Sequence, residues 1–150
     1  MQNGKKRVLL IARKTIKDKV LERIAKLQGS VLLLEDIRDL GSSSQINKVL
    51  KVLIAEEVIT RLGYGVYGKL KYSELLGESY LLDGPLITFR EALTRLDVKW
   101  EPSDFEQDYN EGRSTQIPVN PPTKVLSKFN RKLSYKGRNF RVQKIDKKAE

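Results

Sequence analysis

A run of uncharged polar and lysine side chains near residue 45 has the chemistry needed to read double-stranded DNA. Asn and Gln pair with adenine through two hydrogen bonds, and Lys reaches guanine or backbone phosphate. On the helix expected over Ser44–Glu57, such side chains fill the N-terminal turns and no acidic residue interrupts them. The residues predicted to lie in the major groove are Ser43, Ser44, Gln45, Asn47, Lys48 and Lys51.

A basic hairpin follows this helix and supplies a second set of candidate contacts. Two β-prone stretches, 58–62 and 66–72, flank the turn Gly63-Tyr64-Gly65, where glycine permits a positive φ. Cations on such a hairpin can hold phosphates beside the helix. The side chains predicted to contact the DNA backbone are Arg61, Tyr64, Lys69 and Lys71. The competing interpretations are a solvated helix face and charges that protect an edge strand from aggregation.

An acidic cluster in the second half has the residue types of a Mg²⁺ site. It consists of Asp104, Glu106, Asp108 and Glu111. Their spacing fits no calcium-binding loop, so a solvated acidic loop, or a dock for a basic partner, is the preferred interpretation. We expect no bound metal and no cofactor. A carboxylate–metal enzyme acting on nucleic acid stays a third alternative.

The composition argues against most enzymes and favours a polyanionic partner. The chain has no histidine and no cysteine, which excludes imidazole catalysis and thiolate metal sites. We therefore predict that it is not an enzyme. Lys and Arg outnumber acids by 15 to 7 in residues 1–73 and by 10 to 2 in residues 123–150, while acids lead by 10 to 4 in between. Such basic surfaces bind polyanions through counterion release, or serve solubility alone.

The element order in the first half is typical of a winged helix-turn-helix. Apolar residues at helical spacing predict a helix over 15–27, and a β-prone stretch follows at 31–34. A brief helix at 35–40 stops at Gly41, and three serines, 42–44, can each cap the next helix. The stretches 58–62 and 66–72 then complete the pattern as a wing.

The second half predicts a small α/β module. The spacing from Thr88 to Glu91 is that of a capping box and opens a helix through Leu96. A strand at 98–101 and a polar stretch at 103–122 follow. Three strands at 125–129, 132–135 and 140–144 predict an antiparallel β-meander. Its basic residues either add phosphate contacts or protect edge strands; they are Lys128, Arg131, Lys132, Lys136, Arg138, Arg141 and Lys144.

The predicted fold class is therefore α+β, with two domains. A winged helix-turn-helix DNA-binding domain occupies residues 1–73. The C-terminal α/β domain with its meander occupies 74–150, and a disordered tail begins at about residue 146. No apolar run reaches the roughly 20 residues of a membrane span, and no signal peptide is evident, so we expect a cytoplasmic protein.

Two stretches resemble the AbiEi-like antitoxins and antitoxin-like regulators of bacterial abortive-infection, or type IV, toxin–antitoxin systems. The first is a serine-opened helix followed by an arginine-bearing strand and a G-x-Y strand, here Ser42–Ser44, Arg61 and Gly65-Val66-Tyr67. The second is an S-T-Q-[VI]-P signature, here Ser114–Pro118. Together the resemblance covers most of residues 15–145.

The resemblance implies a transcriptional autoregulator that binds double-stranded DNA at its own promoter and represses the operon. It also implies neutralisation of a nucleotidyltransferase-like toxin, without requiring a stable complex. The alternative function is a protein–protein adaptor, in which the winged helix is only a scaffold and the acidic middle segment docks a basic partner.

Overall fold

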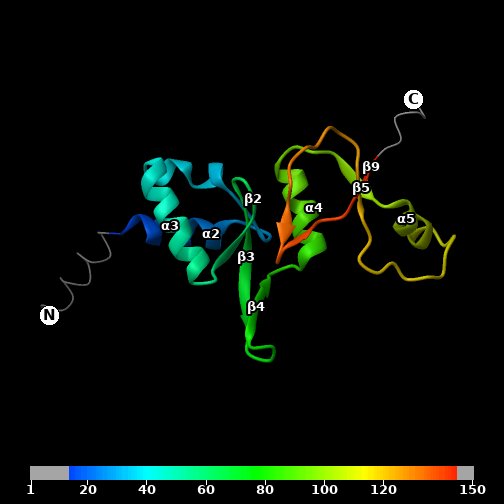
Figure 1. Cartoon of the computed structure of the whole chain (residues 1–150), viewed down its shortest axis with the longest axis horizontal. Coiled ribbons are helices and arrows are strands. Elements are labelled where there is room, and N and C mark those ends of the chain that lie inside the picture. The colour runs from blue at the N-terminus through cyan, green and yellow to red at the C-terminus, as the bar shows by residue number, and fades with distance from the viewer. Residues whose placement is uncertain (1–13, 145–150) are drawn as a thin grey trace, which may run out of the picture.

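A computed structural model describes residues 14–144, which form a mixed α+β fold (Figure 1). Four α-helices lie in this range: α2 (Ile16–Lys26), α3 (Ser43–Ala55), α4 (Pro85–Arg95) and α5 (Asp104–Asn110). The strands are β1 (Val31–Leu33), β2 (Ile59–Gly63), β3 (Val66–Ser73), β4 (Glu78–Leu81), β5 (Trp100–Pro102), β6 (Thr123–Val125), β7 (Ser134–Tyr135), β8 (Arg138–Asn139) and β9 (Val142–Lys144). None of the described helices has the length and apolar character that a bilayer crossing requires.

The predicted helices and strands of the first half are confirmed to within about two residues. Capping boxes start both helices, Thr15 with Asp18 in α2 and Ser42 with Gln45 in α3. Of the three serines, Ser42 is the cap. The predicted helix at 35–40 is instead two 3-10 turns, η1 (Leu34–Asp36) and η2 (Arg38–Leu40). They are separated by Ile37, whose side chain is fully buried, so packing interrupts the helix there.

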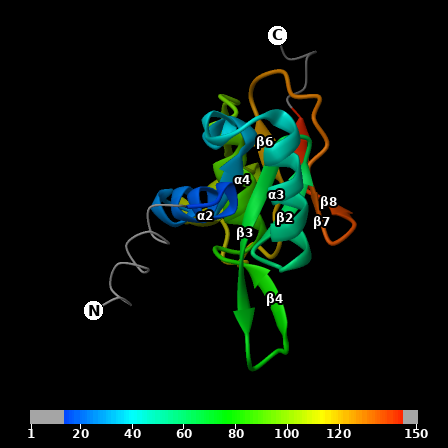
Figure 2. The ribbon, with the colours of Figure 1, turned by 90° about the vertical axis from the view of Figure 1, so that its left-hand side faces the viewer.

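The central sheet has both faces buried. Its strand order is β1-β3-β2, all antiparallel, and β4 pairs with the far half of β3. Because side chains alternate along a strand, Val31 and Leu33 enter one core while Leu32 enters the other. Figure 1 shows the result as three layers, with α2 and α3 on one side of the sheet and α4 on the other. The β3–β4 hairpin projects away from this body (Figure 2).

The packing crosses the predicted domain boundary at residue 73. Strand β4, beyond the boundary, pairs with β3 before it. One core likewise joins Leu62 and Val66 of the sheet to Phe89 and Leu93 of α4. The two predicted halves therefore share a sheet and a core. The predicted tail from residue 146 lies outside the described residues.

The predicted β-meander is wrong. Strand β6 pairs with β5 on one side and, in parallel, with β9 on the other, while β7 and β8 form a separate hairpin. The chain between β6 and β9 bends back over the core because its apolar side chains are buried there. Leu133 packs in the core, and the Phe140 ring stacks on Phe89 at 4.6 Å between centroids.

Other boundaries in the second half also differ from the predictions. Helix α4 begins at Pro85, directly after Gly84. Thr88 therefore lies inside the helix and is not the N-cap that the predicted capping box requires. The predicted polar stretch contains α5, which starts with a capping box of Ser103 and Glu106. Strand β4 was not predicted, because its pairing with β3 is a tertiary contact that leaves little local signal.

A single carboxylate connects the two helical layers through the backbone of β1. The N–H groups of Ser30 and Val31 donate to the Glu91 carboxylate at 3.0 and 2.9 Å. Beside them, the hydroxyls of Ser30 and Thr88 share a hydrogen bond of 2.8 Å. Gly29 has φ +79°, and a Cβ atom there would overlap the carboxylate. The turn from α2 into β1 is thereby attached to α4.

Replacing Glu91 with Ala is expected to lower the free energy of unfolding by about 2 kcal/mol, because two partly buried N–H groups lose their acceptor. Urea denaturation followed by circular dichroism measures this. The control Glu74→Ala changes an exposed acid of the β3–β4 turn and should stay within about 0.5 kcal/mol of wild type. Equal effects of the two changes would contradict the role given to Glu91.

Candidate nucleic-acid interface

A groove of about 620 Å³ lies between α3 and the turn that joins β2 to β3. Ser43, Asn47 and Lys51 line it from α3, since residues four apart share one side of a helix. Arg61 and Tyr64 line it from the other wall, and Tyr64 is 78% exposed. The structure thus brings together side chains from both predicted sets, the helix and the hairpin.

The groove is positively charged. Its lining contains three cations, Arg38, Lys51 and Arg61, and no carboxylate. Arg38 was missed by the sequence analysis, because it lies in η2 outside the helix and hairpin that carried the prediction. The Arg61 side chain donates through Nε to the Gly63 carbonyl at 3.3 Å, which holds it against the turn. The charge and the exposed amide of Asn47 suit phosphate and base edges.

The remaining predicted residues of α3 lie on its solvent-exposed side, outside the groove lining. Ser44 and Lys48 are exposed, and Lys48 is one turn from Lys51 on the accessible surface of the helix. Gln45 is exposed as well, but its side-chain oxygen accepts a hydrogen bond from the Ser42 N–H at 3.0 Å. Part of its hydrogen-bonding capacity is therefore used by the helix cap.

Two predicted contacts on β3 lie apart from the groove. The Lys69 ammonium donates to the Leu27 carbonyl at 2.5 Å, at the C-terminal end of α2. Burial lowers the pKa of Lys69, and the neighbouring Glu91 and Asp83 carboxylates offset this shift only in part. Lys71 is exposed, but it lies opposite Tyr80 on the β3–β4 hairpin. We therefore assign Lys69 a structural role and place Lys71 outside the groove.

The C-terminal segment contributes a cation beside the groove. The Arg131 guanidinium donates to the Tyr64 carbonyl at 3.0 Å, so the segment lies directly on the β2–β3 turn. Leu133 and the Lys132 carbonyl pack so closely on Gly63 that a Cβ there would clash. The sequence analysis listed Arg131 among basic residues that either add phosphate contacts or protect edge strands, but its long-range contact with the β2–β3 turn has no local pattern.

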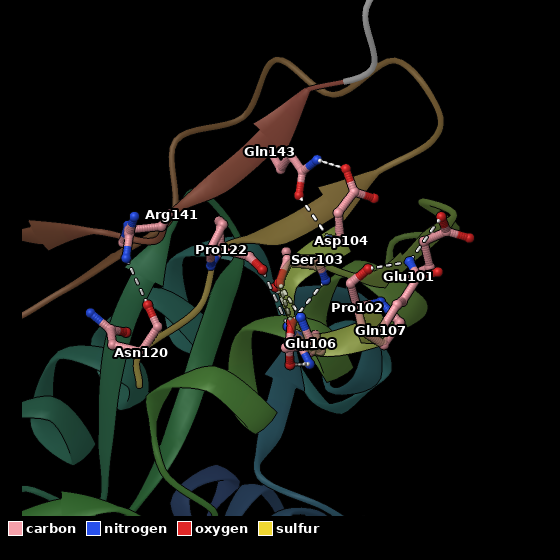
Figure 3. Close-up of polar contacts among 12 residues, drawn as sticks. Glu101, Pro102, Ser103, Asp104, Glu106, Gln107, Asn120, Pro122, Arg141 and Gln143 are labelled. Carbon is pink, nitrogen blue, oxygen red and sulfur yellow. Dashed lines mark hydrogen bonds and ion pairs between the residues drawn. The ribbon is translucent and has the colours of Figure 1, made fainter. Parts of the chain in front are cut away.

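The carboxylates of the acidic cluster are paired with neighbouring side chains, of which Figure 3 shows Gln143 beside Asp104. Asp104 accepts from Lys124 at 3.1 Å and from Gln143 at 2.8 Å, while Arg113 pairs with both Asp108 and Glu111. Among residues 14–144, no three His, Cys, Asp or Glu side chains gather closely enough to hold a metal ion.

The pair of Arg90 and Glu106 is the most buried part of this cluster. Its closest atoms are 2.7 Å apart, and each side chain is 13% exposed. Burial opposes ionisation of Glu106, but hydrogen bonds from Arg90 and Ser103 outweigh it and lower the pKa. Glu106 is therefore an internal counterion that attaches α5 to α4.

Comparison with known proteins places the chain in a family. The model of a family of unknown function, DUF6088, matches residues 13–123. The chain belongs to this family. The match to DUF6088 includes both walls of the groove and ends before Arg131. Searches of curated proteins and of solved structures found no match.

Replacing Lys69 with Met is expected to lower stability by about 1 kcal/mol at neutral pH, because the Leu27 carbonyl loses its donor. The folded-state pKa lies below the ordinary 10.5, so between the two values the unfolded chain binds more protons and the stability contributed by Lys69 rises with pH. The difference from wild type in urea denaturation should therefore grow as pH rises through the lowered pKa of Lys69 toward 10.5. The control Lys71→Met should leave stability unchanged, and a pH-independent difference for Lys69→Met would contradict the assignment.

Replacing Glu106 with Gln is expected to lower the free energy of unfolding by about 3 kcal/mol at neutral pH, because Arg90 keeps a buried charge without its counterion. The folded-state pKa of Glu106 lies below the ordinary 4.5, so its contribution is complete above that value and is lost as pH falls through the lowered one. Wild type and variant should therefore converge in acid. In the control Asp108→Asn, an exposed pair is broken and the change should be under about 1 kcal/mol.

Proposed function

We propose that the chain is a winged helix-turn-helix protein that binds double-stranded DNA. The element order α2, β1, η1–η2, α3, β2, β3 and the sheet order β1-β3-β2 support this fold. The observation that carries the proposal is the groove beside α3, whose lining has three cations and no carboxylate. A helix of about 10–12 Å diameter fits the major groove of about 12 Å.

In this proposal α3 enters the major groove. Ser44 and Lys48 lie on its exposed side, while Asn47 and Lys51 face the groove beside the β2–β3 turn. Asn47 is the candidate for adenine recognition, and the two lysines are candidates for guanine or phosphate. Four further side chains lie beside α3 and are the candidates for contact with the DNA backbone phosphates: Arg38, Arg61, Tyr64 and Arg131.

We further propose an antitoxin-like autoregulatory role in the cytoplasm. Its support is the resemblance to AbiEi-like regulators, through the serine-opened α3, the G-x-Y strand at 65–67 and the S-T-Q-I-P element at 114–118. In this role the protein represses its own operon and counteracts a nucleotidyltransferase-like toxin, functionally and without a required stable complex.

A protein–protein adaptor is the second candidate, and one observation favours it. The turn of the β3–β4 hairpin exposes Leu75 and Leu76, with Leu75 94% exposed, and such apolar tips are typical of partner contacts. The acidic segment that the adaptor hypothesis first relied on is neutralised by Lys124, Arg90 and Arg113. An adaptor binds DNA weakly and without sequence preference, which the next experiment measures.

Footprinting on DNA upstream of the gene, across a salt series, tests the proposal. We expect protection of a defined site, and the Lys48→Ala and Lys51→Ala variants should each reduce the slope of log K against log salt by about one. The matched control Lys99→Ala removes an exposed cation next to β5, across the sheet from α3 (Figure 1). Its slope should equal that of wild type.

Sequence-blind protection, or a slope unchanged in both α3 variants, would argue against DNA reading by α3. Uniform loss of slope in all three variants would indicate only a general charge effect. The Lys69→Met variant is expected to retain wild-type protection.

A further inference from the structure

A second hollow, of about 550 Å³, lies between the start of α4 and the β7–β8 hairpin. It shares no lining residue with the groove beside α3. Its apolar wall contains Phe89 and Phe140, whose rings stack with an interplanar angle of 9°, together with Tyr135. Pockets of 300–1,000 Å³ with mostly apolar walls and a few polar groups are the usual sites for small ligands.

The rim of this hollow is cationic. Lys136, Arg138 and Arg141 line it, and no carboxylate does. The Arg141 guanidinium donates through one nitrogen to the Asn120 carbonyl at 2.8 Å, which fixes its position and leaves other N–H groups for a ligand (Figure 3). Lys136 lies 3.7 Å from Glu78, an exposed pair of little strength.

Arg138 is the rim cation that is most available to a ligand. It is exposed, and within residues 14–144 its side chain forms no hydrogen bond or ion pair. Since the other two rim cations have partners in the protein, the fold makes no evident use of the Arg138 charge. A charge-assisted hydrogen bond to an anion is the contact that this guanidinium can add.

We propose that this hollow binds a nucleotide, with the base against the partly exposed rings of Tyr135 and Phe140 and the phosphates at the cationic rim. Bases stack on aromatic side chains irrespective of sequence, and Arg recognises phosphate through paired hydrogen bonds. A simple anion would leave the partly exposed rings of Tyr135 and Phe140 without a contact, and an apolar ligand would leave the Arg138 charge without a partner. A nucleotide satisfies both parts of the hollow. It can come from a free nucleoside phosphate or from an unpaired end of a nucleic-acid strand.

Isothermal titration of the full chain with ATP, at about 0.15 M salt, tests this site directly. Arg138→Ala should weaken ATP binding at least about tenfold, as loss of one charge-assisted hydrogen bond predicts. The control Lys128→Ala removes an exposed cation of the same segment that does not line the hollow, and it should bind ATP as wild type does. Circular dichroism verifies that the variants are folded.

Three further ligands test which parts of a nucleotide the hollow recognises. Adenosine and tripolyphosphate should each bind more weakly than ATP, because each occupies only one part of the hollow. A four-nucleotide single strand distinguishes the two sources: tighter binding than ATP indicates a strand end, and weaker binding indicates a free nucleotide. Lys51→Ala should leave ATP affinity unchanged. The test of ATP binding is therefore independent of the test of DNA binding at α3.

The proposal is overturned by any of three results. These are no ATP binding at millimolar concentration, equal loss in Arg138→Ala and Lys128→Ala, or tripolyphosphate binding as tightly as ATP.

Discussion

The structure depends on a small sheet that is buried on both faces. With neighbouring side chains of β1 pointing to opposite cores, α2 and α3 must cover one face while α4 and the C-terminal segment cover the other. Apolar burial on both sides is the dominant stabilising term in such an arrangement. One consequence matters for function: the outer side of α3 is left in solvent, and the turn from β2 to β3 is held next to it.

This packing determines which charged side chains become neighbours. Acids of α5 are paired with nearby cations, as Glu106 is with Arg90 and Asp104 is with Lys124, and α5 lies on the side of the sheet remote from α3 (Figure 1). Salt screens charges over roughly 8 Å at physiological ionic strength, so these acids do little to the field at the groove. The positive charge of Arg38, Lys51 and Arg61 therefore acts locally, at the groove beside α3, whose lining has no carboxylate.

Local patterns predicted the first half well. The amphipathic spacing of Val20 and Ile24, or of Ile46, Leu50 and Leu53, is a property of one helix and needs no knowledge of its partner. The second half was predicted poorly for the opposite reason. Its strands are two to four residues long and are defined by their neighbours, so the parallel contact of β6 with β9 has no counterpart in local spacing.

The candidate site divides in the same way. The sequence alone determined two features, the polar, acid-free start of α3 and the turn at Gly63-Tyr64-Gly65. Helix periodicity and backbone sterics act over a few residues, so both features can be recognised locally. Only the tertiary structure decided that Lys69 binds the end of α2 while Arg131, from a distant segment, lies on that turn. Two lysines separated by one residue on β3 look alike in sequence. Burial beside Leu27 distinguishes them, because a buried ammonium must find an acceptor within the protein.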